Sequence, residues 1–197
     1  MNTALIVADD FTPNPTEIRS AALAGEFGTV NHQGADFTGI SKQGEPDLKA
    51  RIEALVGFAI NITLSCFRVN YTGENPNSWI HADQTEADYA VVFYLNLPEQ
   101  CRGGTGFWRH RVYGWDAMPT EDQIKAAGET PGQEFDHSML QDWSTKEIWE
   151  LHSLVGMKFN RLIVYPTRCF HSRVPFDGFG STPRDGRLIW VCFFNRA

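Results

Sequence analysis

The sequence lacks features that would point to several large classes of protein. It has no run of about 18 apolar residues, which a membrane-spanning helix needs, and no basic segment precedes the short apolar stretch near its start. Positive charge is scarce, because 17 Lys and Arg stand against 24 Asp and Glu and give a net charge of −7. General binding to nucleic-acid phosphates is therefore not expected. We expect a cytoplasmic protein without a membrane span.

Motifs for a disulfide framework or for a second domain are also missing. The four cysteines form no C-x-x-C pair and lie in or beside apolar segments, as is typical of reduced, buried thiols. At 197 residues the chain is long enough for one domain with a substantial core. We predict a single domain over residues 1–197, and the oligomeric state stays open.

Several short segments have the two-residue period of β-strands. Residues 60–66 alternate between apolar and polar side chains, which predicts a strand with one buried face, whereas residues 90–96 are apolar on both faces and predict a central strand. Further strands are expected at 5–8, around His81, at 160–166 and at 187–195. Many short strands separated by Gly and Pro turns predict a mainly β fold, a sandwich or jelly roll.

Helical patterns occur near the N-terminus and in the middle of the chain. Apolar residues at helical spacing over 16–25 and 47–58 predict two helices that flank the sheet as an N-terminal helical layer. Residues 27–44 show no clear period and are expected to form a loop. Residues 107–153 contain four tryptophans and two helical stretches, at 121–127 and 146–153. We interpret them as an insertion that acts as a lid or substrate wall, or whose tryptophans only pack on the barrel.

The clearest candidate for chemistry is the pair His81 and Asp83. Residues two apart on an extended backbone project from the same face, so this imidazole and this carboxylate could bind one metal ion. No other histidine in the chain has an acidic residue two positions later. With a second, distant histidine the pair would form a 2-His-1-carboxylate triad, which leaves part of the coordination sphere of a ferrous ion open.

Two residues near the C-terminus could complete such a site. His171 follows the apolar segment that ends at Pro166, and Arg187 opens the last apolar strand. A buried guanidinium at that position would need an anion, and the strand supplies no acid, so a small dicarboxylate is a candidate partner. An exposed Arg187 that pairs with Asp185, and a His171 that is only a core or surface residue, are the alternatives.

These residues resemble the pattern of the iron- and 2-oxoglutarate-dependent dioxygenases, specifically the prolyl-4-hydroxylase-like branch. The resemblance covers about 60–96 and 160–195. It consists of Tyr71 ten residues before the His81-x-Asp83 motif, a strand that ends in Tyr94-Leu-Asn, a Gly-Gly turn at 103–104, a distal His171, and Gly186-Arg187 on the last strand. The resemblance implies a double-stranded β-helix, which is a form of jelly roll.

The resemblance also implies a role for each matched residue. His81, Asp83 and His171 would bind Fe(II), and Arg187 would pair with the distal carboxylate of 2-oxoglutarate, with Arg184 and Arg173 as rivals for that role. Tyr94, and secondarily Tyr71, would hydrogen-bond the cosubstrate. The insertion at 107–153 is longer than in compact prolyl hydroxylases. This difference leaves the identity of the substrate open but does not affect the predicted metal ligands.

The implied reaction uses O2 and 2-oxoglutarate, with ascorbate as a possible reductant, and hydroxylates or otherwise oxidises a substrate with release of succinate and CO2. A small molecule, a free amino acid or a peptide side chain would all be compatible. Two other readings stay open. One is a non-catalytic jelly-roll protein that binds a metal or a small acid, and the other is a cupin-type hydrolase or isomerase that uses zinc or manganese.

Overall fold

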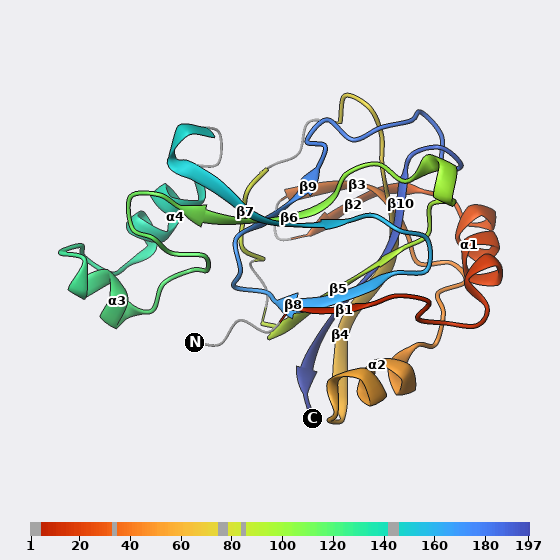
Figure 1. The fold of residues 1–197 in the computed structure, drawn as a ribbon, viewed down its shortest axis with the longest axis horizontal. Helices are drawn as coiled ribbons and strands as arrows, with labels where there is room; N and C mark the ends of the chain where they lie inside the picture. The colour runs from red at the N-terminus through yellow and green to blue at the C-terminus, as the bar shows by residue number, and fades with distance from the viewer. Residues whose placement is uncertain (1–4, 33–34, 75–78, 84–85, 142–145) are drawn as a thin grey trace.

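The computed structural model describes residues 5–32, 35–74, 79–83, 86–141 and 146–197. Two antiparallel β-sheets face each other, and helices lie outside them (Figure 1). The chain therefore has the predicted fold class, a jelly roll that is mainly β with flanking helices.

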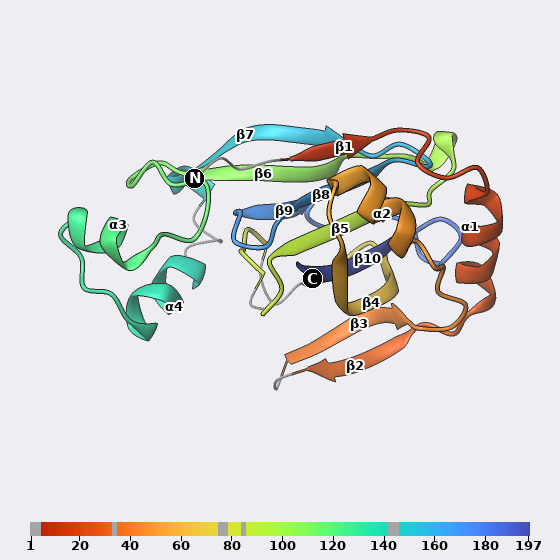
Figure 2. The same cartoon turned by 90° about the horizontal axis from the view of Figure 1, so that it is seen from below.

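Seven strands form the larger sheet, in the order β1-β8-β5-β10-β4-β3-β2. Their bounds are β1 Ile6–Ala8, β2 Gly28–His32, β3 Ala35–Ser41, β4 Ile60–Asn70, β5 Tyr89–Tyr94, β8 Leu162–Pro166 and β10 Arg187–Arg196. The smaller sheet has the order β7-β6-β9, with bounds β6 Gly104–His110, β7 Trp149–Gly156 and β9 His171–Val174. Figure 2 shows the β2–β3 edge of the larger sheet on the side of the molecule opposite to β6 and β7.

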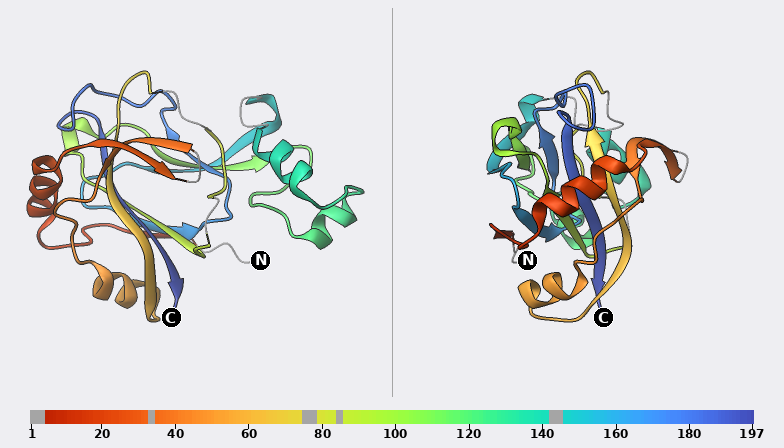
Figure 3. Two further views of the ribbon diagram at one scale, coloured as in Figure 1. Left: turned by 180° about the vertical axis from the view of Figure 1, so that it is seen from behind. Right: turned by 90° about the vertical axis from the view of Figure 1, so that its right-hand side faces the viewer.

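The outer face of the larger sheet is apolar and covered by the first two helices. Helices α1 (Pro15–Ala24) and α2 (Lys49–Val56) contribute side chains to a buried cluster with outward-facing residues of β4, β5, β8 and β10. Phe67 and Trp190 lie directly opposite each other on β4 and β10 and are almost fully buried in this cluster. Both helices match the sequence prediction, and Figure 3 shows them on the side of the molecule opposite to α3 and α4.

The inner face of the larger sheet packs against the smaller sheet. Val92, Ile163 and Ile189 from the larger sheet share a buried cluster with Phe107 of β6 and with Met157. Strand β10 therefore contributes alternate residues to two different cores, as the strongly apolar sequence of this strand requires. Toward one end of the inner face the apolar residues give way to polar ones.

The predicted loop at 27–44 is wrong, because β2 and β3 form a hairpin there. Strand β3 joins the edge of β4 through the pairs Ile40 with Arg68 and Ser41 with Phe67. These partners are distant in the sequence, so the pairing leaves no local signal in a segment with few apolar residues.

The single buried face predicted for residues 60–66 is also wrong. Leu64 lies opposite Phe193 and Ile62 lies opposite Phe194, so a β-bulge in this pairing turns Ile62 and Leu64 to different faces of the sheet. Ile62 is 39% exposed. An extra residue in one strand is invisible to a strict two-residue period, which explains the error.

The segment 107–153 starts and ends in paired strands. Strands β6 and β7 pair along their length, and the described residues between them form α3 (Glu121–Ala126), α4 (Gln133–Gln141) and the 3-10 turn η3 (Lys146–Ile148). A second 3-10 turn, η1 (Pro98–Gln100), precedes β6. The helix predicted at 121–127 is confirmed, whereas the helix predicted at 146–153 is wrong, since most of it is strand β7. Helices α3 and α4 project away from the sheets (Figure 1).

The cysteines agree with their prediction. All four are free thiols, and Cys66, Cys169 and Cys192 are buried. Among the described residues, no helix combines the length and the apolarity that a bilayer crossing requires.

Candidate metal and small-acid site

Two backbone hydrogen bonds join the segments that carry the predicted histidines. The amide of His81 donates to the carbonyl of His171 at 3.0 Å, and the amide of His171 donates to the carbonyl of His81 at 2.8 Å. His81 therefore lies in an isolated bridge rather than in the regular strand predicted for it. His171 opens β9 in the smaller sheet, after a turn that follows β8.

The structure brings His81, Asp83 and His171 together. Their potential ligand atoms all lie within 4.8 Å of one another. The Nε2 atom of His81 is 3.7 Å from Oδ1 of Asp83, and the Nε2 atom of His171 is 3.6 Å from Oδ2 of the same carboxylate. Two imidazoles and both carboxylate oxygens thus face a common point.

Each imidazole is oriented by a backbone carbonyl two residues earlier in the chain. Nδ1 of His81 lies 3.0 Å from the carbonyl oxygen of Trp79, and Nδ1 of His171 lies 2.9 Å from that of Cys169. If Nδ1 carries the proton in each ring, Nε2 keeps a lone pair that faces the other members of the triad. Outer hydrogen bonds of this kind fix the tautomer of metal-binding histidines.

Burial sets the protonation of the triad. It lowers the pKa of His81 and of His171 to about 4, so both rings are neutral at pH 7. It raises the pKa of Asp83 to about 6, and Oδ2 of this carboxylate is buried without a hydrogen-bond donor among the described residues. A buried carboxylate oxygen without a donor is costly, and a metal cation would neutralise it.

The triad opens into a cavity of about 200 Å³ between the sheets. That volume is several times the roughly 30 Å³ that a water molecule occupies in the liquid, so the cavity can hold a small organic acid. Its polar wall consists of residues from β3, β4, β6, β9 and β10 and from the segment that carries the triad. They include Asp36, Thr38, Arg68, Asn70, Glu74, Thr105, Ser172, Arg173 and Arg187.

Arg187 is buried, which is the case in which the sequence analysis expected it to need an anionic partner. The residue is 4% exposed, and its Nη1 donates to Oδ1 of Asn70 at 3.2 Å. Its Nε is buried without a partner among the described residues, and its guanidinium carbon lies 5.8 Å from the ring centroid of Tyr94. Burial lowers the pKa of Arg187, yet no described carboxylate forms an ion pair with it. An anionic ligand would offset the cost of burying this cation.

Comparison with known proteins places this chain in a family. The model of a family of unknown function, DUF6445, matches residues 1–194. The chain belongs to DUF6445. The description of that family names no activity, and none of the curated proteins matches this DUF6445 chain.

Solved structures with similar folds are distant in sequence. A prolyl hydroxylase from Trichoplax adhaerens, in complex with a peptide of the hypoxia inducible factor, has a TM-score of 0.57 and 12% identity over 99% of this chain and 84% of its own. The alpha-ketoglutarate-dependent carbocyclase SnoK from nogalamycin biosynthesis has a TM-score of 0.59 and 13% identity over 99% and 80%. HygX from Streptomyces hygroscopicus, with nickel, 2-oxoglutarate and hygromycin B bound, has a TM-score of 0.50 and 11% identity over 99% and 84%. At such identities the likeness establishes a shared fold.

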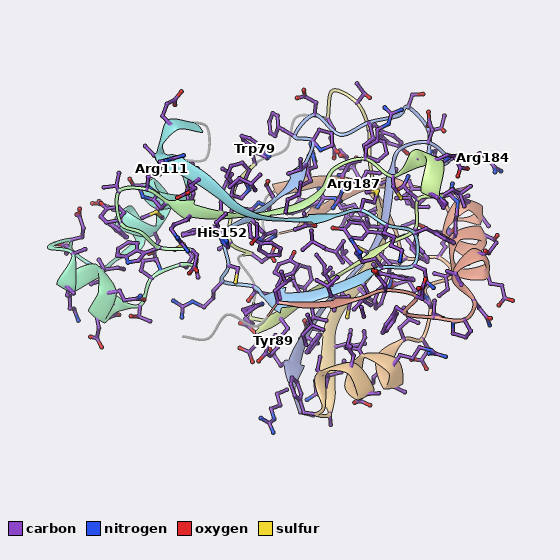
Figure 4. The ribbon with its side chains drawn as sticks, in the orientation of Figure 1. Trp79, Tyr89, Arg111, His152, Arg184 and Arg187 are labelled. Atoms are coloured by element: carbon purple, nitrogen blue, oxygen red, sulfur yellow. The ribbon has the colours of Figure 1, made fainter. Side chains whose placement is uncertain are left out.

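The rival arginines of this DUF6445 chain lie in different settings. Arg173 already pairs with Glu74, because its Nη1 lies 3.2 Å from Oε2 and its Nη2 donates to the Glu74 carbonyl at 2.9 Å. The side chain of Arg184 is exposed, and Figure 4 shows it beside α1, far from Arg187 inside the barrel. Of the three arginines, Arg187 is the one that is buried and lacks an acidic partner among the described residues.

The two predicted tyrosines are placed differently. Tyr94 is fully buried, its hydroxyl lies 2.6 Å from that of Thr105, and it also hydrogen-bonds Arg187. It supports Arg187 without lining the cavity itself. Tyr71 packs against the outer cluster under α1 and α2, so the structure does not bring it to the cavity. Tyr165 lines the cavity instead, with its ring centroid 4.8 Å from that of His171.

Arg68, Asn70 and Glu74 were missed by the sequence analysis. Oε2 of Glu74 accepts from Nδ2 of Asn70 at 2.8 Å, and its Oε1 accepts from the Thr38 hydroxyl at 2.7 Å. Asn70 in turn holds Arg187, so one chain of hydrogen bonds connects β3, β4, β9 and β10. The available signal was that β4 becomes polar at every second residue from 68, opposite to the buried Phe67 and Val69.

The insertion borders this cavity only indirectly. No described residue between 107 and 153 lines it. Trp108 is one link to it, because its Nε1 donates to Oγ of Ser172 at 2.9 Å and its ring lies 5.2 Å from that of Trp79, a cavity residue. Trp115 and Trp149 pack within an aromatic cluster of the insertion, and the predicted Trp143 lies outside the described residues.

Proposed function

We propose that this protein is a Fe(II)- and 2-oxoglutarate-dependent dioxygenase. The observation that carries the proposal is the convergence of His81, Asp83 and His171 beside the buried Arg187, all on one cavity. Supporting evidence comes from the shared fold with the prolyl hydroxylase, SnoK and HygX, whose own descriptions name a hydroxylase, alpha ketoglutarate and 2-oxoglutarate.

The donor set fits a ferrous ion. Two neutral imidazoles and one carboxylate on one side of the ion match the facial triad, and they leave room for further ligands from the cavity. The orphaned Oδ2 of Asp83 gives the triad an unsatisfied anionic oxygen. A zinc or manganese hydrolase of the cupin type would more often present a histidine-rich set.

The residues around the triad have complementary tasks. Arg187 binds the distal carboxylate of 2-oxoglutarate as a planar fork, and Tyr94 and Asn70 hold the guanidinium in place. The apolar inner face next to them, including Ile189 and Val92, excludes water from the rest of the cavity. When bound, iron with 2-oxoglutarate and O2 supplies oxidation of a substrate C–H bond, with release of succinate and CO2 and with ascorbate as a possible reductant.

The proposed function is compatible with several classes of substrate. A small molecule, a free amino acid or a peptide side chain in the cytoplasm would suit a site that opens beside Trp79 and β3. Membership of the prolyl-4-hydroxylase-like branch is part of the proposal, as is a single oxygenase domain in which the insertion at 107–153 acts as a lid or wall. The family model that spans residues 1–194 supports one continuous unit.

A succinate assay tests the proposal. Protein supplied with Fe(II), ascorbate and 2-oxoglutarate should release succinate slowly even without its substrate, and Asp83→Ala should lose both this release and stoichiometric binding of Fe(II) measured by calorimetry under anaerobic conditions. Asp122→Ala, at an exposed position on α3, is the matched control and should behave like the wild type. Metal and 2-oxoglutarate binding without succinate would indicate the alternative, a non-catalytic jelly-roll binding protein.

A further inference from the structure

Arg68 occupies a second cationic position on the wall of the cavity. It lies on β4 directly opposite Ile189, and Asn70 lies directly opposite Arg187, so the two arginines are diagonal neighbours on the same face of the sheet. Diagonal neighbours on adjacent strands lie roughly 7–8 Å apart, within reach of long side chains. Burial lowers the pKa of Arg187 and the guanidinium of Arg68 adds to this, whereas at Asp83 the same guanidinium opposes the rise in pKa that burial causes.

No described carboxylate forms an ion pair with Arg68. Its Nε is buried without a hydrogen-bond partner among the described residues, and its guanidinium carbon lies 5.8 Å from the ring centroid of Phe37 on β3. The acids on the cavity wall are engaged elsewhere: Asp36 accepts from Asn31 at 2.7 Å, and Glu74 binds Thr38, Asn70 and Arg173. A partly buried guanidinium without an anion is destabilising, and an anionic ligand would remove that cost.

The charged groups next to the triad in the proposed holoenzyme leave one positive charge over. The ferrous ion, Arg68 and Arg187 contribute four positive charges, whereas Asp83 and the 2-oxoglutarate dianion contribute three negative ones. The further acid on the cavity wall, Asp36, is exposed, so solvent screens its charge. Arg173 and Glu74 neutralise each other in a close pair. The positive charge without a partner is that of Arg68, because Arg187 is assigned to the distal carboxylate of 2-oxoglutarate.

We infer that Arg68 binds an anionic group, a carboxylate or a phosphate, of the primary substrate. This inference rests on the proposed function and narrows its substrate class to acids. The remainder of the substrate lies against the aromatic rings of Phe37 and Trp79, which line the same cavity. Arg68 would therefore fix the substrate on the β3 side of the cavity, one strand away from Arg187.

Small anions test this assignment without knowledge of the substrate. Protein loaded with Zn(II) and saturated with 2-oxoglutarate is titrated with acetate, inorganic phosphate and the neutral acetamide, and binding is followed by NMR. At least one of the two anions should bind in the millimolar range, acetamide should not, and the anion that binds better identifies the charged group. Arg68→Met should weaken that binding at least tenfold, whereas Arg68→Lys should keep it within about threefold.

A matched control exists on the outside of the molecule. Arg196 is exposed, and its guanidinium carbon lies 5.1 Å from the ring centroid of Phe58, so Arg196→Met removes a similar contact far from the cavity and should leave anion binding unchanged. Equal anion binding by wild type and Arg68→Met, or no anion binding by the wild type, would overturn the inference. Thermal unfolding of each variant checks that it is folded. If Arg68→Met is unfolded, Arg68→Gln takes its place in the titrations.

Affinity for 2-oxoglutarate separates this inference from the proposed function. Arg68→Met should change it less than fivefold, whereas Arg187→Met should lower it at least 50-fold. If Arg68→Met lowers it as much as Arg187→Met, Arg68 serves the cosubstrate and the inference fails while the dioxygenase assignment stands. If the wild type binds neither metal nor 2-oxoglutarate, it is the proposed function that fails.

Discussion

The two faces of the seven-stranded sheet are built from the same strands but differ in function: the outer face forms a hydrophobic core, and the inner face carries the charged residues of the candidate site. On the outer face, Phe67 and Trp190 pack under α1 and α2 in a continuous apolar cluster. On the inner face, the same two strands present Arg68, Asn70 and Arg187, and two of these three side chains have a buried nitrogen without a partner among the described residues.

This difference separates what stabilises the fold from what the site needs. Apolar burial on the outer face contributes directly to the free energy of folding. Partly satisfied cations on the inner face reduce it, since their desolvation is not offset by an ion pair. Substitutions on the two faces should consequently have opposite effects on stability and on ligand binding.

The largest effect is expected on the outer face. Phe67→Ala should lower the free energy of unfolding by about 3–5 kcal/mol, because it removes a fully buried ring and leaves a cavity. Urea unfolding measures this change, and Leu154→Ala, at a position that is 49% exposed, should change stability by less than about 0.5 kcal/mol. The folded fraction of Phe67→Ala should bind 2-oxoglutarate as the wild type does, and weaker binding would remove the proposed division between the faces.

The next largest effect is expected on the inner face, where a substitution should weaken ligand binding without lowering stability. Arg187→Ala should weaken 2-oxoglutarate binding by about 2–5 kcal/mol, roughly 30- to 5000-fold, because a buried charge-assisted pair is lost. The ligand-free variant should be at least as stable as the wild type, since an unpaired buried cation has been removed. Calorimetry gives the affinity, and urea unfolding gives the stability. A destabilisation as large as that of Phe67→Ala would show that Arg187 has a structural role.

A smaller effect is expected at Asn70, which positions Arg187. Asn70→Ala removes the acceptor for Nη1 of Arg187 and the donor to Glu74, and it should weaken 2-oxoglutarate binding about tenfold. Asn61→Ala, at an exposed position of the same strand, should leave the affinity unchanged. An affinity equal to that of the wild type in Asn70→Ala would mean that Tyr94 alone orients the guanidinium.

The smallest effect concerns an ion pair on neither face. Hydrogen bonds from Arg161 and Lys158 hold the pKa of Asp9 well below its usual range, but the carboxylate is 39% exposed. Asp9→Asn should therefore cost less than about 1 kcal/mol at pH 7. A lowered folded-state pKa stabilises the protein above the unfolded-state value near 3.8, so the difference between variant and wild type should shrink as the pH falls below that value. Denaturant unfolding at several pH values from 7 to 2 measures it, and a difference that does not shrink at all below pH 3.8 would contradict this origin.

The sequence predicted the fold class and the triad because both depend on regular signals. A segment that is apolar on both faces identified the central strand β5, and the single His-x-Asp pair identified His81 and Asp83. The sequence left open whether Arg187 is buried or exposed, and the structure shows that it is buried, the case in which an anionic partner is expected. The assignment of these four residues to iron and 2-oxoglutarate stays a prediction.

The errors have a common physical origin in pairing between distant parts of the chain. The β2–β3 hairpin depends on contacts with β4, and strand β7 depends on contacts with β6, so short polar segments became strands without a strong pattern of their own. Residues 150–154 are all exposed, which removed the apolar alternation that would have identified β7. Arg68 was missed for the same reason: its importance depends on the pairing of β4 with β10, which places it diagonally next to Arg187.

The reciprocal amide hydrogen bonds between His81 and His171 have a kinetic consequence. They fasten the two ligand-bearing peptides to each other before any ion arrives, so the histidines need not be gathered from separate mobile loops during loading. Exchange of these two amide protons with deuterium should be slow in the apoprotein already. The proposed metal site would therefore lose its ion and take up another without local unfolding.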